Sequence, residues 1–168
     1  MKNFSISPLL PSDTERFYSL AAEYLPDSDP ERIRHFAAVY PQVYQTLRLD
    51  GRIIGICYGW FRRHFAPEDP SFTLDGICIE YDHWRQGYGT RLLHSFEDAA
   101  RFCGAQVVSV GSGLDSEPFY IACGYLPKEY KVWADGKPVI EHVFSGLEDY
   151  RTYRRQGPDG FVVLAKNL

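Results

Sequence analysis

The sequence predicts an α+β fold in which a central, mostly antiparallel mixed sheet is flanked by helices. The chain has 168 residues, of which 45% are hydrophobic and 24% charged, and this size and balance suit one globular domain with a substantial core. Amphipathic helical stretches open the chain, and strands joined by a tight turn follow them. Strands then alternate with helices, so we expect a single domain over residues 1–168.

The N-terminal region combines a short edge strand at residues 3–8 with two helices. Ser12 and Glu15 have the spacing of a capping box, in which each side chain bonds the backbone N–H of the other residue. The second helix begins with Asp29 as N-cap and Pro30 in its first turn. Both helices carry apolar residues at helical spacing, so each has a face to bury against a sheet.

The sheet follows the two helices. Residues 42–49 and 52–61 have the composition of strands, and Asp50-Gly51 between them predicts a hairpin turn. Residues 71–81 form another strand, after which an amphipathic helix runs to about residue 102 and Gly104 is placed to close it. The remaining predicted elements are strands at 106–111, 129–134, 139–144 and 161–165, and helices at 116–123 and 146–156.

Gly87-Tyr88-Gly89 lies directly between a predicted strand and a predicted helix. Glycine lets the backbone turn sharply and approach an anion without a Cβ in the way. The first N–H groups of the helix carry the positive end of its dipole, so the turn can hold a diphosphate, with Arg85 adding charge and Thr90 a hydroxyl. A glycine turn that binds nothing is the alternative interpretation of these letters.

Two other nucleotide-binding motifs are excluded by the same residues. A dinucleotide-binding fold needs a third glycine where this chain has Leu92. The pattern G-x-x-x-x-G-K-S/T of a P-loop is absent from the sequence.

Two stretches resemble the GNAT acetyltransferase superfamily. Residues 74–93 are similar to its acyl-CoA motif, a strand followed by a basic turn of form Q/R-x-x-G-x-G/A and an apolar helix, although Trp84 stands where the family usually has Gln or Arg. Residues 118–125 (PFYIACGY) are similar to its F-Y-x-x-x-G-F signature, with Gly113 where an Asn often precedes it. The two motifs occur in the family's order and span roughly 50 residues.

The resemblance implies a GNAT-like fold and an N-acetyltransferase that passes an acetyl group from acetyl-CoA directly to a primary amine. Tyr120 would lie near the sulfur of CoA. The implied cofactor-binding residues are the main chain of Ile77, Cys78 and Ile79 for the pantetheine arm, and Trp84, Arg85, Gln86, Gly87, Tyr88, Gly89 and Thr90 for the pyrophosphate. The alternatives are a module of the same fold that senses acyl-CoA without turnover, and a structural domain with neither property.

The chemistry of acetyl transfer requires a proton acceptor for the amine and a proton donor for the thiolate. Tyr120 is the candidate general acid, because its reference pKa is near 10. Asp75 is the candidate general base, acting directly or through water, because even spacing on one strand predicts that it shares a face with Ile77 and Ile79. A strand carboxylate bonded to a nearby loop is an equal alternative for Asp75. Glu80 is predicted to point the other way, into solvent.

Composition excludes several other classes of function. The net charge of −4 does not favour binding to nucleic acid. No stretch is apolar and long enough to span a membrane, and no signal-like segment opens the chain, so we expect a cytoplasmic location. No metal is expected, because neither the four cysteines nor the histidines at 35, 64, 83, 94 and 142 have the spacing of ligands.

The acceptor and the assembly are left open by the sequence. The acceptor is expected to be the amine of a small molecule or a peptide, and a homodimer is the common default for small enzymes. An aromatic and basic cluster at residues 60–65 is either part of the acceptor cleft or a sheet edge that enters a loop. Residues 148–156 either cover the acceptor site, make a dimer contact or form a surface helix.

Overall fold

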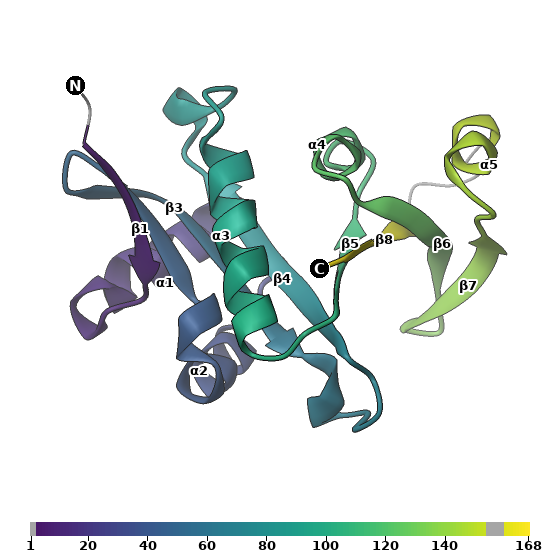
Figure 1. The fold of residues 1–168 in the computed structure, drawn as a ribbon, viewed down its shortest axis with the longest axis horizontal. Helices are drawn as coiled ribbons and strands as arrows, with labels where there is room; N and C mark the ends of the chain where they lie inside the picture. The colour runs from purple at the N-terminus through teal and green to yellow at the C-terminus, as the bar shows by residue number, and fades with distance from the viewer. Residues whose placement is uncertain (1–2, 154–159) are drawn as a thin grey trace. The chain divides into compact units, whose positions relative to one another are not determined.

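The computed structural model describes residues 3–153 and 160–168, which form two compact units. One unit consists of Met1–Gln106 with Leu168, and the other of Val107–Asn167. Each unit has its own strands and helices (Figure 1). The α+β class is confirmed, and the single domain stays a prediction.

The strands of the first unit pair antiparallel, and the hairpin predicted around Asp50-Gly51 is confirmed. β1 (Phe4–Pro8), β2 (Gln45–Leu49), β3 (Arg52–Phe61) and β4 (Ser71–Ile79) pair in this order, each antiparallel to the next. Asp50 and Gly51 form the turn between β2 and β3 with φ of 50° and 85°, the left-handed conformation that a tight hairpin needs.

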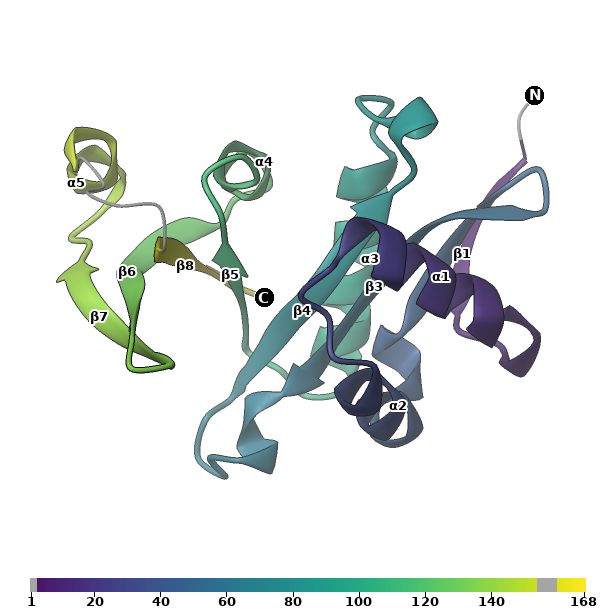
Figure 2. The same cartoon turned by 180° about the vertical axis from the view of Figure 1, so that it is seen from behind.

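Helices cover both faces of these strands. α1 (Thr14–Tyr24) and α2 (Pro30–Val39) lie on one face, and α3 (Tyr88–Phe102) crosses the other (Figures 1 and 2). Gly104, with φ of 89°, follows α3 as predicted. Short 3₁₀ turns at Pro11–Asp13, Pro41–Val43, Arg62–His64 and Tyr81–His83 complete the unit. The buried core includes Phe17, Leu20, Ile33, Tyr44, Leu47, Ile54, Tyr58, Phe72, Leu92 and Phe96.

One of the two predicted helix caps is correct. The Asp29 side chain accepts hydrogen bonds from the backbone N–H groups of Glu31 and Arg32, at 3.0 and 3.2 Å. The capping box at Ser12 is wrong, because α1 begins after Asp13, whose carboxylate forms an ion pair with Arg48 and makes no cap bond. A tertiary ion pair has replaced the local cap there.

The second unit is a smaller antiparallel arrangement. β5 (Val107–Ser112), β8 (Gly160–Asn167), β6 (Leu126–Ala134) and β7 (Lys137–Val143) pair in this order. α4 (Glu117–Ala122) follows β5, and α5 (Leu147–Thr152) follows β7. The predicted continuation of the last helix to residue 156 lies partly outside the described residues.

Among the described residues, no helix is both long and apolar enough to cross a membrane. All four cysteines are free, Cys57 and Cys78 being buried. Residues 3–153 and 160–168 contain no cluster of histidine, cysteine and carboxylate side chains that could hold a metal ion.

Candidate active site

The turn between β4 and α3 is open to solvent. Trp84, Arg85, Gln86 and Gly87 are exposed, and Tyr88, Gly89 and Thr90 begin α3. Gly87 is the N-cap residue with φ of 81°, and a Cβ built there would meet no atom within 4 Å. Gly87 has no side chain with which to cap α3. The positive end of the helix dipole therefore faces an exposed turn, which suits a diphosphate.

Side chains of the turn bind its own backbone. The indole N–H of Trp84 donates to the carbonyl of Ile79 at 2.6 Å, and the Gln86 side-chain amide donates to the carbonyl of Asp82 at 3.1 Å. Arg85 adopts a left-handed conformation with φ of 57°, which costs a non-glycine residue about 1 kcal/mol. These two bonds hold the turn in a shape that its non-glycine residues do not favour by themselves.

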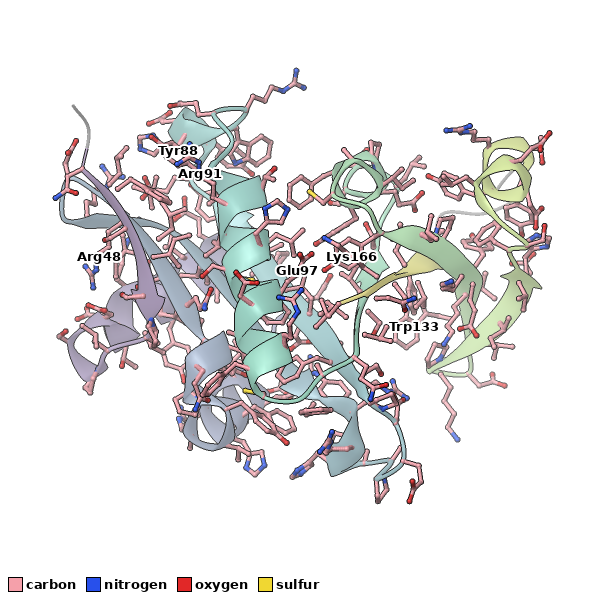
Figure 3. All side chains as sticks on the ribbon, in the orientation of Figure 1. Arg48, Tyr88, Arg91, Glu97, Trp133 and Lys166 are labelled. Atoms are coloured by element: carbon pink, nitrogen blue, oxygen red, sulfur yellow. The ribbon has the colours of Figure 1, made fainter. Side chains whose placement is uncertain are left out.

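The first turn of α3 also rests on strand β1. Figure 3 shows Tyr88 and Arg91 near the start of this helix. The ring of Tyr88 stacks on Phe4 with centroids 6.0 Å apart, and the guanidinium carbon of Arg91 lies 5.1 Å from the centroid of the Phe4 ring. Tyr88 is therefore occupied in packing, and we expect its backbone to serve the candidate site.

Glu80 anchors the approach to the turn. Its carboxylate is 8% exposed and forms ion pairs with Arg16 of α1 and Arg52 of β3, while Nε2 of His83 lies 3.9 Å away. Burial alone would raise the pKa of Glu80, but the hydrogen bond and charge of Arg52, with the charges of Arg16 and His83, hold that pKa below its usual value. The prediction that Glu80 is solvated is wrong. The two arginines come from distant segments that only the fold brings together.

The main chain of Ile77, Cys78 and Ile79 lies in β4, where it pairs with Cys57, Ile56 and Gly55 of β3. The Cys78 thiol is buried, with Sγ 3.9 Å from the carbonyl oxygen of Leu20, and burial raises its pKa to about 12. Cys78 is thus a neutral packing residue of this strand, and a role for its main chain towards pantetheine stays a prediction.

Asp75 lies in a β-bulge of β4. Tyr58 pairs with Gly76 and the next residue, Gly59, pairs with Leu74, so Asp75 is the extra residue in the ladder. A bulge re-aims a side chain and interrupts the two-residue alternation. Even spacing is therefore not sufficient to place Asp75 on the face of Ile77 and Ile79, and this placement stays a prediction.

The carboxylate of Asp75 faces helix α2. Nε and Nη2 of Arg32 donate to its two oxygens, each at 3.2 Å. Burial raises the pKa of Asp75, and the charge and hydrogen bonds of Arg32 oppose that rise without cancelling it. A partly exposed carboxylate with a raised pKa is suited to accepting a proton.

Tyr120 is a buried residue of α4. Its ring lies 5.1 Å from the Phe119 ring and 5.7 Å from the Tyr125 ring, between centroids. Glu117, fully buried at the start of the same helix, accepts a hydrogen bond from the hydroxyl of Tyr150 at 2.6 Å. α5, the C-terminal helix whose role the sequence left open, is thus tied to the helix that carries Tyr120.

The aromatic cluster at residues 60–65 packs against α2. The rings of Trp60 and Phe36 stack at 5.7 Å between centroids, and His64 contacts Phe36 at 5.1 Å. Phe65 completes the cluster, with its centroid 5.3 Å from Trp60, and stays exposed. This cluster therefore packs on α2 through Phe36, and a part for it in the acceptor cleft stays a prediction.

Comparison with known proteins identifies the family. The sequence profile of the Acetyltransferase (GNAT) family matches residues 9–125, which include the turn and Tyr120. The chain belongs to the GNAT acetyltransferase family. Its members are acyl-CoA-dependent acetyltransferases, so family membership supports acetyl transfer in general.

Solved structures of GNAT proteins share the fold along the whole chain. Ard1 from Thermoplasma volcanium has a TM-score of 0.71 at 14% identity, covering 98% of this chain and 97% of that one. Arabidopsis thaliana Naa50, in complex with the bisubstrate analogue CoA-Ac-MVNAL, gives 0.72 at 11%, covering 98% and 99%. The polyamine N-acetyltransferase of Drosophila melanogaster gives 0.67 at 14%, covering 99% and 100%. No curated protein sequence matches this chain.

The GNAT turn was predictable from the sequence, but three residues that pair with Glu80 or Asp75 were not. Arg16 and Arg52, which hold Glu80, occur without any motif in the sequence. Arg32 is one of several charged residues on α2, and no local signal distinguishes it from Arg34, which pairs with Glu31 on the helix surface. Only the register of β4 against α2 shows that Arg32 reaches Asp75.

Proposed function

We propose that this GNAT protein transfers the acetyl group of acetyl-CoA to a primary amine in one direct step. The observation that carries the proposal is the turn from Trp84 to Thr90, whose first four residues are exposed and in which Gly87, a residue without a side chain, starts helix α3. Two neighbours of the same fold differ in their acceptors: Naa50 binds the bisubstrate analogue CoA-Ac-MVNAL, and the Drosophila enzyme forms N-acetylagmatine. An amine acceptor is the chemistry they have in common.

The turn would hold the pyrophosphate of acetyl-CoA mainly through backbone N–H groups. Gly87 leaves room for the anion, and the exposed Arg85 adds a positive charge. The main chain of Ile77 and Ile79 would bond the pantetheine arm, as an added strand bonds a sheet edge. Trp84 already occupies one lone pair of the Ile79 carbonyl; a carbonyl oxygen has a second one to offer.

The bound acetyl-CoA would supply an activated thioester, and side chains of the protein would accept and donate the protons. The neutral amine attacks the carbonyl carbon, so a C–N bond forms and the C–S bond breaks. Asp75 would accept the proton that the amine loses, directly or through water, and Tyr120 would protonate the departing thiolate. Since a free alkylammonium has a pKa near 10.4, it must lose a proton before it can attack at neutral pH.

A matched pair of glycine variants tests the turn. Gly87 and Gly104 flank α3 with φ of 81° and 89°, and a Cβ at either position would meet no atom within 4 Å. Alanine should therefore cost both positions about 1 to 2 kcal/mol of backbone strain. Only Gly87→Ala should also weaken acetyl-CoA binding, by about tenfold or more, since only there does a Cβ obstruct the anion.

Calorimetry with acetyl-CoA, followed by release of free thiol with a panel of amines, separates the functions. Tight binding with thiol release supports the proposed enzyme. Binding without release for any amine indicates a module that senses acyl-CoA. Absence of binding to the wild-type protein, or equal affinity in the Gly87→Ala and Gly104→Ala variants, would refute the proposed site.

A further inference from the structure

The ion pair between Arg32 and Asp75 places a positive charge directly beside the candidate base. Each carboxylate oxygen receives one nitrogen of the guanidinium, at 3.2 Å. The side chain of Arg32 is 39% exposed and that of Asp75 17%. The pair is therefore within reach of a ligand from solvent and is not sealed in the core.

The groups around this pair leave it electrically balanced. Tyr44 and Tyr58 are buried beside Asp75, and burial raises the pKa of both, so their hydroxyls stay neutral. Asp29, the remaining carboxylate that acts on Asp75, is bonded to the backbone N–H groups at the start of α2. Arg32 and Asp75 consequently offer a ligand one cationic and one anionic partner.

An acceptor that carries only an ammonium group fits this arrangement poorly. Its ammonium would bond the lone pairs of Asp75 that Arg32 leaves free, and it would add a second positive charge beside the Arg32 guanidinium. An acceptor that also carries a carboxylate brings a negative charge for the N–H groups of Arg32 that Asp75 does not use. Its amine bonds Asp75, its carboxylate receives two parallel hydrogen bonds from Arg32, and no charge is left without a partner.

We propose that the acceptor is an aminocarboxylate, a small molecule whose carboxylate lies a short carbon chain away from its amine. This inference rests on the proposed function, in which Asp75 receives the amine. It assigns Arg32 as the residue that determines specificity, by binding the acceptor carboxylate. It also disfavours polyamines, whose additional positive charges would meet Arg32.

The test compares acids with their amides as acceptors. Thiol release at saturating acetyl-CoA is measured for glycine against glycinamide and β-alanine against β-alaninamide, with each kcat/KM expressed per neutral amine. We expect the acids to be preferred by about tenfold or more, as for other charge-assisted, two-bond recognition of carboxylates. Equal use of acids and amides would overturn the inference.

Two substitutions on the same helix connect the preference to Arg32. R32M should abolish the preference for acids, whereas R34M, which removes an exposed arginine paired with Glu31, should keep it. R32K retains the charge without the planar fork and should fall in between, which also serves if R32M does not fold. A preference that persists in R32M or R32K at the wild-type value would show that Arg32 does not bind the acceptor.

Failure of this inference can be told apart from failure of the proposed function. If the wild-type protein releases thiol with amines and uses acids and amides alike, the acetyltransferase proposal survives and the role of Arg32 is refuted. If no amine of either kind causes thiol release, the proposed function itself fails, and the preference for carboxylates fails with it.

Discussion

Replacing Glu80 by glutamine removes the negative charge that Arg16 and Arg52 share. Glutamine keeps the size of the side chain, so the change tests the charge and its hydrogen bonds more than the packing. The carboxylate is 8% exposed, whereas Arg16 is 37% and Arg52 66% exposed. Water can therefore reach the two cations once their partner is lost, but it reaches the Glu80 position poorly.

The expected loss is about 1 to 3 kcal/mol in the free energy of unfolding at pH 7. Breaking a buried ion pair costs about 3 to 5 kcal/mol when the remaining charge stays buried, and the exposure of both arginines lowers this figure. A hydrogen bond to a charged group contributes about 1.5 to 3 kcal/mol. The ion-pair figure, lowered for exposure, and the hydrogen-bond figure both fit a loss of about 1 to 3 kcal/mol.

The pKa of Glu80 determines how its contribution to the free energy of unfolding changes with pH. The pKa of Glu80 is lower in the folded protein than its ordinary value of 4.5, so its contribution is complete above the pKa of the unfolded chain. That contribution is lost as the pH falls through the folded-state pKa. The difference in stability between the wild-type and Glu80→Gln proteins should therefore be constant from pH 7 to about 5 and shrink in more acidic solution.

Urea unfolding of three proteins measures this effect. The control is Glu31→Gln, because Glu31 also pairs with an arginine but is 81% exposed, and such surface pairs contribute little. We expect the midpoint of Glu80→Gln to fall well below that of the control at pH 7. Equal midpoints for the two variants, or a Glu80→Gln deficit that is unchanged in acid, would refute the electrostatic reasoning.

The two candidate catalytic residues give further predictions. Tyr120→Phe should reduce turnover by about 10² with acetyl-CoA affinity unchanged if it protonates the thiolate; turnover equal to the wild type removes Tyr120 from the mechanism. In the wild type, kcat/KM should fall in acid as Asp75 is protonated, at a pH above the ordinary range of carboxyl groups because burial raises this pKa. Asp75→Asn should lower the rate and lose that acidic limb, and an unshifted pH profile would count against Asp75 as the base.

The sequence predicted those parts of the fold that depend on local chemistry. Asp50-Gly51 adopts the left-handed conformations of a hairpin turn, and Asp29 caps α2 with its side chain. Gly104 follows α3 with a positive φ. In each case the atoms that determine the conformation lie within a few residues of one another, so the local sequence is sufficient to predict it.

Predictions failed where a distant partner competes with a local rule. Asp13 bonds Arg48 and does not take part in the expected capping box of α1. Glu80 should have faced solvent by the alternation of a strand, yet the fold surrounds it with Arg16 and Arg52. Such partners are separated by many residues, and no periodicity in the sequence marks them.

In the candidate site, too, the locally determined part was predictable and the part that depends on distant contacts was not. The glycine turn was predictable because strand, turn and helix are contiguous in the chain. The position of Asp75 was not, because a β-bulge adds one residue to β4 and breaks the alternation on which the prediction relied. Arg32, which reaches Asp75 from α2, was missed for the same reason: their contact depends on the register of a helix against a bulged strand.

The one departure of this chain from the usual GNAT turn, Trp84, helps to hold the backbone of the turn. Arg85 occupies a left-handed position that glycine would adopt without strain, and Trp84 replaces the usual Gln or Arg. The Trp84 indole in turn bonds the carbonyl of Ile79 and thereby fixes the end of β4 to the turn. If backbone N–H groups provide the grip on the cofactor, side chains at positions 84 and 85 are free to change as long as they preserve this shape. Gly87 would have no such freedom, since its φ of 81° disfavours a side chain and a Cβ there would enter the space proposed for the anion.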